Sequence, residues 1–543
     1  MAALPVVFSR MTAMNPCDRP GANHRTEARK DVRHGREDDM RTWGPLTAVC
    51  LGTFMLLLDV TIAVVALPDM ARGLHASLSD LQWVMDGYAL ALAALLLGLG
   101  AAADVLGRRR VHVAGVVLFA VASLLCGLAT GPGMLVAARG LQGLGAAAMF
   151  ATTLPLLGSV YQGRRRSMAL GVWGAVSGAA AAVGPVLGGL LTDGPGWRWI
   201  FWVNLPVSVA AVWLTLRVVP ESRGAAGRRV DWAGTATFAA FAGAVTYGAV
   251  RAGSHGWTEG GTLVSFALAV VALGAFVAVE HRVADPLLDP RLFLRPAFSG
   301  VMLGGLAFNA AAFGVMAYTS IWLQTMLGMS PVRGGLVFVW LSLASFVVAA
   351  AGGRLLHGVP ARLTIGGGLL LIAAGQFCMA FLDAGSTASA LVPGLLLVGV
   401  GTGLVSPGIA GAALAAVPAE RSGMAGGAVN TFRQLGYALG IAVFGTVLTS
   451  RMQDRLPHDA AHGLAGGAAG ALRGVFGEHA LRASFASGLN AAAVAAGAVA
   501  AVAGVLVLVL VGAGRGGRNA GVTDSAPPAL EEEEATPVAP YRR

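Results

Sequence analysis

The sequence contains little charge. Only 12% of its 543 residues are Asp, Glu, Lys or Arg, whereas soluble domains contain about 25%. Hydrophobic residues make up 56% of the chain, and 77 residues are glycine. Apolar segments of about 20 residues, long enough to cross a bilayer, recur from Pro45 to Gly512. This pattern excludes an ordinary soluble protein and leaves no room for a soluble domain between the segments.

Lysine is nearly absent, since Lys30 is the only one. A P-loop requires the pattern Gly-x-x-x-x-Gly-Lys-Ser/Thr, and Lys30 is followed by Asp31 in a polar tail without those glycines. The chain therefore cannot itself use ATP in the P-loop manner. It also has no His-Glu-x-x-His or Gly-x-Ser-x-Gly pattern, and we do not expect an enzyme.

Cysteine is scarce and scattered. Cys50, Cys126 and Cys378 lie inside apolar segments, Cys17 lies in the N-terminal tail, and no Cys-x-x-Cys pair occurs. This pattern supports neither a disulfide framework nor a metal site. We therefore expect no metal and no bound cofactor.

Fourteen apolar segments predict fourteen transmembrane helices, and hence an all-α integral membrane protein. They occupy residues 45–67, 82–102, 113–130, 134–157, 168–191, 200–218, 232–250, 262–279, 298–323, 335–352, 363–382, 391–417, 426–449 and 490–511. The polar tails at 1–44 and 513–543 are predicted to be disordered. A polar external loop is predicted at 450–489.

The arginines predict how these helices are oriented. The formal net charge is +10, and most basic residues fall in the tails and in clusters such as Arg108–Arg110, Arg164–Arg166 and Arg228–Arg229. Clusters of this kind stay on the cytoplasmic side of a membrane, so both termini are predicted to be cytoplasmic. Their position between apolar segments favours the lipid bilayer, and not nucleic acid, as their partner.

Two segments of the chain are similar to each other. Residues 166–171 open the fifth helix with Arg-Ser-Met-Ala-Leu-Gly, and residues 421–427 open the thirteenth with Arg-Ser-Gly-Met-Ala-Gly-Gly. A Gly-x-x-x-Gly step follows each, at 184–188 and 436–440. Chance similarity in a chain rich in Gly and Ala is the alternative, but a repeat flanking an inserted helix pair is typical of duplicated transporters.

Five motifs occur in order along the first six predicted helices. They are Leu58-Asp59-Val60-Thr61-Ile62-Ala63-Val64-Val65-Ala66-Leu67-Pro68, Gly100-Ala-Ala-Ala-Asp104-Val-Leu-Gly107-Arg108-Arg109, Arg139-Gly-Leu-Gln142-Gly143, Gly184-Pro185-Val-Leu-Gly188-Gly189, and Trp197-Arg198-Trp199-Ile-Phe201 with Asn204-Leu-Pro206. In these motifs the chain resembles the major facilitator superfamily, and specifically its fourteen-helix drug:proton antiporters. Val64 departs from the family signature, which has asparagine there.

The resemblance implies a major facilitator fold with six-helix bundles at 45–219 and 298–512 and two inserted helices within 220–297. It implies a secondary active exporter that exchanges drug-like or antibiotic organic molecules for protons by alternating access. It also implies a monomer in the bacterial cell membrane, driven by the proton gradient. A dedicated exporter of one endogenous metabolite is an alternative. A proton-coupled importer is another, although the antiporter motif argues against it.

Asp59 and Arg139 are candidates for proton coupling. Asp59 lies roughly 21 Å into its helix and Arg139 roughly 8 Å from the other membrane face, which places them at nearly equal depth. A carboxylate at that depth should face a cavity or a partner, and separating it from an arginine during alternating access would drive proton uptake and release. Permanent pairing that only holds helices together is the alternative. Thr61, in the same signature, is a further candidate for the coupling or substrate site.

The motif at the cytoplasmic end of the second helix is predicted to be a conformational switch. Its candidate residues are Gly100, Asp104, Gly107, Arg108 and Arg109. The carboxylate can pair with arginine or cap a helix in one access state only. Anchoring of the arginines on the cytoplasmic side is the alternative.

The antiporter motif is predicted to form a packing hinge. Gly184, Pro185, Gly188 and Gly189 leave one helix face without side-chain bulk and remove one backbone donor. These features permit a bend and a close helix contact.

Several further polar residues are candidates for the substrate site. Asp86 departs from the uncharged residue usual in the family and is predicted to set charge preference or to join the proton coupling, with a solvated carboxylate at the helix end as the alternative. Other residues are candidates for a polar cavity or for interhelical hydrogen bonds. These are Gln142, Asn309, Gln324, Asn430 and Arg433.

Overall fold

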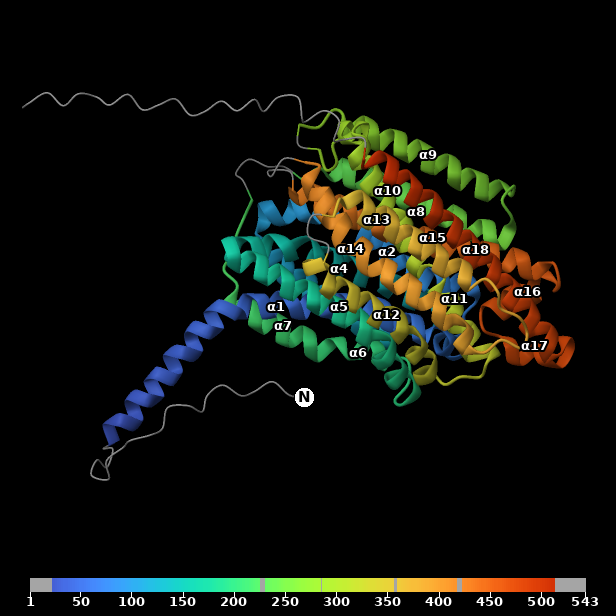
Figure 1. Cartoon of the computed structure of the whole chain (residues 1–543), viewed down its shortest axis with the longest axis horizontal. Helices are drawn as coiled ribbons and strands as arrows, with labels where there is room; N and C mark the ends of the chain where they lie inside the picture. Colours follow the sequence, from blue (N-terminus) through green and yellow to red (C-terminus); the bar gives the residue numbers. More distant parts are fainter. Residues whose placement is uncertain (1–21, 225–229, 285, 356–358, 418–421, 513–543) are drawn as a thin grey trace, which may run out of the picture.

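In the computed structural model, which describes residues 22–224, 230–284, 286–355, 359–417 and 422–512, long helices lie side by side (Figure 1). Fourteen helical segments within these residues are long and apolar enough to cross a membrane. No β-strand occurs in the same residues. The predicted all-α membrane fold with fourteen spans is confirmed.

The first six spans form one bundle, which we call the N-bundle. It consists of α1 (Ala22–Leu74), α2 (Leu78–Leu106), α3 (Arg108–Gly127), α4 (Pro132–Val160), α5 (Gly163–Asp193), and α6 (Trp199–Trp202) with α7 (Asn204–Val218). Helix α4 packs against α2 and α3, and α1 packs against α5. Gly143 of α4 allows the first contact, because a Cβ atom there would overlap the carbonyl oxygen of Tyr88 in α2.

The last six spans form the C-bundle. Its helices are α10 (Pro296–Phe313), continued by α11 (Met316–Ile321) and η2 (Trp322–Met326), then α12 (Pro331–Leu355), α13 (Ala361–Cys378), α14 (Val392–Ala415), α15 (Ser422–Gln453) and α18 (Glu478–Leu510). The Gly-x-x-x-Gly step of α15 packs on α10. A Cβ atom at Gly440 would lie 2.8 Å from the Cα atom of Ala310, and one at Gly436 would overlap the backbone of Leu306.

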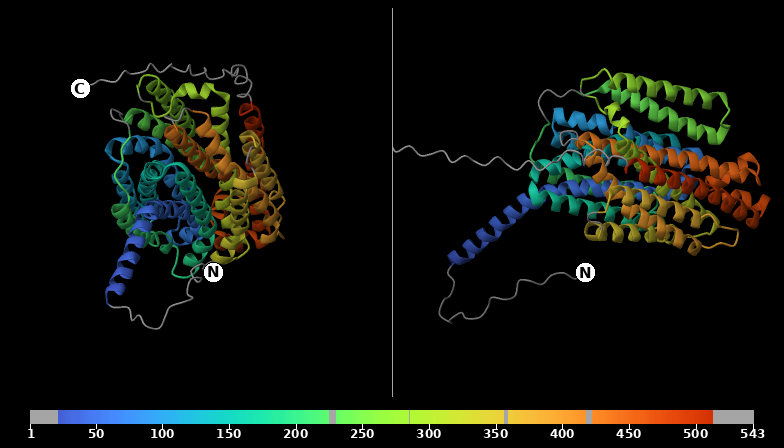
Figure 2. Two further views of the ribbon diagram at one scale, coloured as in Figure 1. Left: turned by 60° about the vertical axis from the view of Figure 1, so that its left-hand side comes forward. Right: turned by 45° about the horizontal axis from the view of Figure 1, so that its top comes forward.

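The inserted pair lies at the edge of the molecule (Figure 2). Helices α8 (Trp232–His255) and α9 (Gly260–Glu280) pack together, and α8 also contacts α2 and α15. Thr446 of α15 donates a hydrogen bond to the carbonyl oxygen of Ala249 in α8, at 3.2 Å. The outer face of α9 exposes valines such as Val264 and Val270, as expected for a helix that contacts lipid.

Short polar signals set where several spans begin. At the start of α2 the backbone N–H of Asp80 donates to Ser77 Oγ, and the backbone N–H of Ser77 donates to the Asp80 carboxylate. This reciprocal capping satisfies two backbone donors that a helix start leaves free. Pro132 opens α4, where its missing N–H costs nothing, and the Asp231 carboxylate caps α8.

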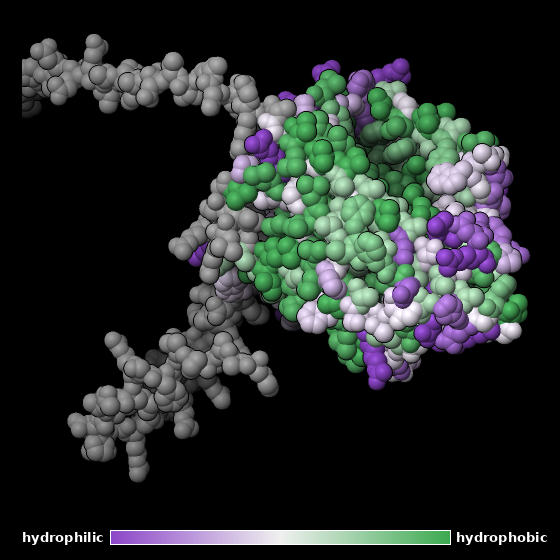
Figure 3. All heavy atoms as spheres, turned by 45° about the vertical axis from the view of Figure 1, so that its right-hand side comes forward, coloured by the Kyte–Doolittle hydropathy of each residue, from purple (hydrophilic) through white to green (hydrophobic). Residues whose placement is uncertain are grey.

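The surface follows the same division between lipid and water. Figure 3 shows apolar side chains over most of the side of the molecule, with hydrophilic side chains gathered towards its right-hand end. Helices α16 (His458–Ala465) and α17 (Ala469–Phe476) lie at that end in Figure 1. An apolar side with polar ends is what a bilayer requires.

The prediction of a disordered tail at 1–44 is wrong for residues 22–44. Helix α1 begins at Ala22 and continues without a break into the first span. The segment 22–42 contains five arginines, two alanines and two glutamates, residues with high helix propensity, and the span behind it removes the cost of nucleation. Residues 1–21 and 513–543 lie outside the described residues.

The predicted loop at 450–489 is largely helical. Helix α15 extends to Gln453, α18 begins at Glu478, and α16 and α17 lie between them. Helices α15 and α18 therefore project past their apolar segments. Hydrophobicity ends at the limits of the apolar segments, whereas a helix continues as long as its backbone hydrogen bonds are made.

The two bundles meet mainly along three helix pairs, which are α1 with α11, α2 with α15, and α5 with α12. We call the side where α1 enters the bundle near Trp43 and α18 ends at Leu510 the terminal side, and the other the opposite side. The number of described spans is even, so the first span begins and the last span ends on the same side.

Candidate functional site

A polar cluster lies inside the N-bundle, and its centre is the carboxylate of Asp59 in α1. Arg139 of α4 forms an ion pair with it, with Nη1 2.5 Å from Oδ2. Gln142, one turn further along α4, donates from Nε2 to Asp59 Oδ1 at 2.9 Å, and Asn204 of α7 donates to the same oxygen at 3.2 Å. All four side chains are buried. The structure therefore brings Asp59 and Arg139 together, as their depths in the sequence indicated, and adds Gln142 to them.

The Arg139 guanidinium is held on several sides. Its Nε donates to the carbonyl oxygen of Val84 at 3.0 Å, and its Nη1 also donates to Gln142 Oε1 at 2.7 Å. The ring of Tyr88 in α2 lies 4.4 Å from Cζ, which is a cation–π contact. Because these partners come from α1, α2 and α4, movement of any one helix would change the surroundings of the charge.

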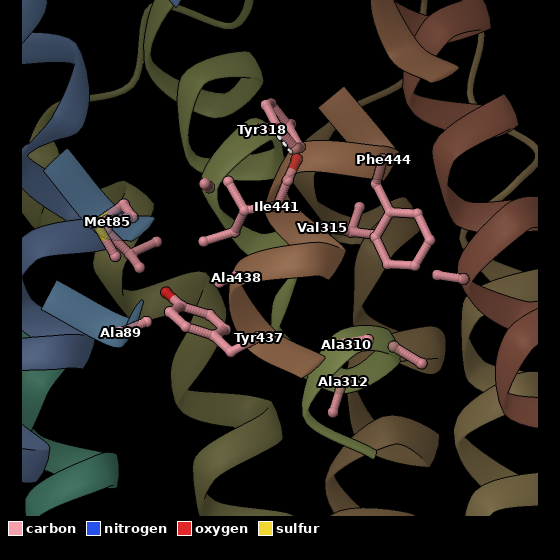
Figure 4. Packing of buried hydrophobic residues seen from close by; sticks show 14 of the residues in the cluster. Met85, Ala89, Ala310, Ala312, Val315, Tyr318, Tyr437, Ala438, Ile441 and Phe444 are labelled. Carbon is pink, nitrogen blue, oxygen red and sulfur yellow. Dashed lines mark hydrogen bonds between the residues drawn. The ribbon is translucent and has the colours of Figure 1, made fainter. Parts of the chain in front are cut away.

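Asp86 is not a solvated carboxylate at a helix end, and that alternative is wrong. Its side chain is buried, and neither carboxylate oxygen has a hydrogen-bond partner within the described residues. It lies on α2, the helix that contacts α15 of the C-bundle. On this stretch of α2, Met85 and Ala89 lie opposite Tyr437 of α15 (Figure 4). Asp86 is therefore a buried acidic group beside the bundle interface.

The antiporter motif brings α5 close to α1 in its own bundle and to α12 in the C-bundle. A Cβ atom at Gly188 would lie 2.9 Å from the carbonyl oxygen of Ile62 in α1, and one at Gly189 would lie 2.6 Å from the Cα atom of Val332 in α12. Gly184 faces Thr61, whose Oγ1 donates to the carbonyl oxygens of Leu57 and Leu58 at 3.1 Å. Pro185 is approached by Gly335 of α12. The predicted close packing is present, and Thr61 belongs to this contact because Gly184 faces it. The Thr61 hydroxyl is bonded to the backbone of its own helix.

The motif at the end of α2 is docked on the segment that follows α7. Arg108 forms an ion pair with Asp104 at 2.9 Å, and its backbone N–H donates to the carbonyl oxygen of Ser222 at 2.9 Å. The Glu221 carboxylate accepts from the backbone N–H of Arg109 at 3.0 Å. Gly107 has φ +113° and faces that carboxylate, where a Cβ atom would lie 2.8 Å from Cδ. A side chain at this position would therefore clash and strain the backbone.

Gly100 plays a smaller part than the rest of that motif, since a Cβ atom there would meet only Ala151, at 3.8 Å.

In the C-bundle, Arg433 of α15 donates from Nε to Asn309 Oδ1 of α10 at 3.3 Å. Asn430 bonds to the carbonyl oxygen of Gly426 in its own helix. The structure thus joins Arg433 to Asn309 and leaves Asn430 outside this pair.

Both side-chain hydrogen bonds that join the bundles in the described part of the chain lie on the opposite side. Gln324 of η2 donates to the carbonyl oxygen of Val65 in α1 at 2.7 Å. Gln82 of α2 donates to the Tyr318 hydroxyl at 2.9 Å, and that hydroxyl donates to the carbonyl oxygen of Ile441 at 2.5 Å (Figure 4). The bundles are therefore fastened together on the opposite side.

Sequence reasoning did not assign a role to several of these residues. Asn204 was visible only as part of a motif, no pattern in the sequence pointed to a contact between Tyr88 and Arg139, and Glu221 lies in a polar linker. Ser123, which accepts a hydrogen bond from Gln142 at 2.9 Å, carries no signal in the sequence. Tyr318 resembles any aromatic residue of an apolar segment.

No group of three or more His, Cys, Asp or Glu side chains in the described residues is placed to hold a metal ion.

Comparisons with known proteins agree with this architecture. The family model described as Major Facilitator Superfamily matches residues 49–441. The chain is 37% identical to the multidrug resistance protein Stp of Mycobacterium tuberculosis over 76% of this chain and 77% of that protein. It is 35% identical to the tetracenomycin C resistance and export protein of Streptomyces glaucescens over 77% of this chain and 78% of that protein.

Among solved structures, the human organic anion transporter MFSD10 is similar in fold, with a TM-score of 0.58 and 15% sequence identity over 86% of this chain and 99% of that one. The family model covers most of the chain, and the relatives align with it across most of both lengths. The chain therefore belongs to the major facilitator superfamily.

Proposed function

We propose that the chain is a secondary active exporter of drug-like or antibiotic organic molecules, which it exchanges for protons by alternating access. The observation that carries the proposal is the buried ion pair of Asp59 and Arg139 inside a membrane-spanning bundle. Charged groups at that depth are unfavourable and mark proton or substrate pathways. The names of two relatives, a multidrug resistance protein and an antibiotic resistance and export protein, support the same function.

Asp59 is the proposed proton carrier. Its carboxylate accepts from Arg139, Gln142 and Asn204. A proton on Asp59 would remove the negative charge that these donors bind and would leave Arg139 without a counter-charge, which is costly inside a protein. The helices α1, α4 and α7 that carry these groups would then favour a different arrangement. Proton binding is in this way linked to the change of access.

The terminal side is proposed to be cytoplasmic, because arginine clusters stay on that side of a membrane. The hydrogen bonds that join the bundles then lie on the external side, and the structure represents a state closed to the outside. The contacts of Asp104, Arg108 and Glu221 would hold the α2–α3 connection in this state and be released in the other. We propose that the chain acts as a monomer in the bacterial cell membrane, needs no cofactor and has no enzymatic activity.

A dedicated exporter of one metabolite is the second candidate. One relative, the tetracenomycin C resistance and export protein, is named for a single compound, and this favours the second candidate. Competition separates the two functions, since a multidrug exporter is inhibited by many unrelated compounds and a dedicated exporter by one.

The test is dye efflux from an efflux-deficient bacterial host that expresses the chain, with and without a protonophore. We expect efflux of the cationic dye ethidium in the wild type, and loss of it in Asp59→Asn and in protonophore. The matched control is Asp459→Asn, which changes a fully exposed aspartate of α16 and should leave efflux unchanged. Efflux that continues in protonophore, or in a well-expressed Asp59→Asn variant, would contradict the proposed coupling.

A further inference from the structure

Arg433 is an arginine within a membrane span that lacks a counter-charge. It lies about 14 Å along α15 from Met424, where the span begins. In contrast to Arg139, which pairs with Asp59, Arg433 forms no ion pair with any described residue. A guanidinium stays protonated in proteins, and a cation inside a membrane is unfavourable without an anion or water beside it.

The side chain of Arg433 is nonetheless oriented. Its Nε donates to Asn309 Oδ1 at 3.3 Å, and the ring of Phe308 lies 5.2 Å from Cζ. Its aliphatic part crosses Gly305 of α10, where a Cβ atom would lie 3.4 Å from Cγ. These contacts fix the stem and one edge of the guanidinium. They leave the edge formed by the two Nη nitrogens without a protein partner among the described residues.

That free edge is accessible. Arg433 is half-buried, and neither Nη nitrogen belongs to the fully enclosed polar atoms that lack a partner. Tyr437, one turn further along α15, lies opposite Met85 and Ala89 of α2 (Figure 4), so this face of α15 points towards the N-bundle. Arg433 is on the terminal side of Tyr437, away from the hydrogen bonds that fasten the bundles together. Arg433 therefore lies on the face of α15 that is turned towards the N-bundle, with its free edge not fully enclosed.

We propose that Arg433, positioned by Asn309 and Phe308, binds the acidic group of anionic substrates, so that organic anions such as carboxylates and phenolates are among the molecules that the chain exports. The inference rests on the proposed function and adds a substrate class to it. The paired N–H groups of a guanidinium match a carboxylate in a bidentate manner. An incoming anion would supply the counter-charge that the C-bundle does not provide.

The rival explanation is that Arg433 neutralises Asp86 in another access state. Both are membrane residues without an ionic partner in this structure, and they lie on the neighbouring helices α15 and α2. In that case the arginine would serve every substrate equally, whatever its charge.

The test compares two dyes and two measurements. Binding of fluorescein, an organic anion, to the purified full-length chain is measured by fluorescence anisotropy, and efflux of fluorescein and of the cation ethidium is measured in cells. In Arg433→Gln we expect fluorescein binding and efflux to fall about tenfold or more, with ethidium efflux retained. Arg433→Lys keeps the positive charge without the paired N–H groups of the guanidinium and should give an intermediate loss of fluorescein binding and efflux. Arg451→Gln, on the exposed end of the same helix, is the control.

The outcomes separate this inference from the proposed function. Ethidium efflux by a wild type that neither binds nor exports fluorescein would overturn the anion site and leave the exporter. Fluorescein binding that depends on Arg433, without efflux of either dye, would support the site and contradict the exporter. A third outcome is that Arg433→Gln loses efflux of both dyes equally and that the double variant Asp86→Asn/Arg433→Gln recovers it. This result would show that Arg433 pairs with Asp86 and would overturn the inference. Melting curves establish that each variant is folded. If Arg433→Gln does not fold, Arg433→Lys takes its place in the comparison.

Discussion

Gln324 of the C-bundle donates a hydrogen bond to the backbone carbonyl of Val65 in the N-bundle, at 2.7 Å. A backbone acceptor moves only when its helix moves, so this bond reports directly on the position of α1 relative to η2. It joins two segments that are far apart in the sequence, on the opposite side of the membrane domain. The bond therefore helps to hold the two bundles together on that side.

Replacing Gln324 should weaken that closure. One hydrogen bond of this kind contributes about 1 kcal/mol net, so Gln324→Ala is expected to change the ratio of the two access states about fivefold. Spin labels on Arg72→Cys and Asp383→Cys, both exposed, allow the distance between the bundles to be measured by pulsed electron resonance after replacement of the native cysteines. We expect a larger long-distance fraction in Gln324→Ala. Gln453→Ala changes a half-buried glutamine near the end of α15 that contacts His462 of α16 and not the N-bundle, and it should leave the distribution as it is.

The ion pair of Asp59 and Arg139 should behave as a buried pair. Removing one partner leaves the other charge uncompensated, so Arg139→Gln is expected to lower the free energy of unfolding by about 3–5 kcal/mol. The double variant Asp59→Asn/Arg139→Gln should be more stable than Arg139→Gln alone, yet inactive in proton-coupled efflux. Thermal unfolding of the purified chain measures the first effect and dye efflux the second.

A matched control for that pair is Arg451→Gln. Arg451 and its partner Asp454 are both more than half exposed, and exposed pairs contribute about 0–1 kcal/mol. If the double variant Asp59→Asn/Arg139→Gln were active, the buried pair would only hold α1 and α4 together, which is the structural alternative to proton coupling.

The depth of polar residues in the membrane was predictable from the sequence, whereas their direction was not. Each helical residue adds about 1.5 Å, and this spacing alone placed Asp59 and Arg139 at one level. Which face of a helix meets which neighbour depends on packing of the whole bundle. For that reason Ser123 and Tyr318 were not assigned a role, and Asp86 was left open between a buried and a solvated carboxylate. Glu221 was missed because a glutamate in a polar linker carries no pattern.

The histidine pair of helix α16, on the opposite side, gives a prediction about pH. Burial of His462, with a further contribution from the neighbouring His458, lowers the pKa of His462 below its usual value. The neutral form is thus favoured in the folded chain, so its contribution to stability is complete above about pH 6.5 and is lost as the pH falls. We expect the melting temperature to fall between pH 7.5 and 5.5, and to fall less in His462→Gln. The exposed His479, replaced by Gln, is the control, and an unchanged pH dependence in His462→Gln would contradict the assignment.

The antiporter motif yields the most direct test of how the bundles close. A Cβ atom at Gly189 would lie 2.6 Å from the Cα atom of Val332 and 2.7 Å from the carbonyl oxygen of Pro331. Because both are backbone atoms of α12, no side-chain movement relieves the overlap, and the larger side chain of Gly189→Val must separate α5 from α12. Since that contact joins the two bundles, we expect Gly189→Val to lengthen the distance between labels at 72 and 383 and to reduce efflux about tenfold or more.

The control lies on the same helix. A Cβ atom at Gly174 of α5 would meet nothing within 4 Å, so Gly174→Val adds the same side chain to the same element without a clash. It should leave both the label distances and the efflux at wild-type values. If Gly189→Val kept the short distances and lost efflux all the same, closure would not depend on this glycine and the motif would act through a substrate contact instead. If both variants lost activity equally, the effect would come from any added side chain on α5 and not from the contact of Gly189 with α12.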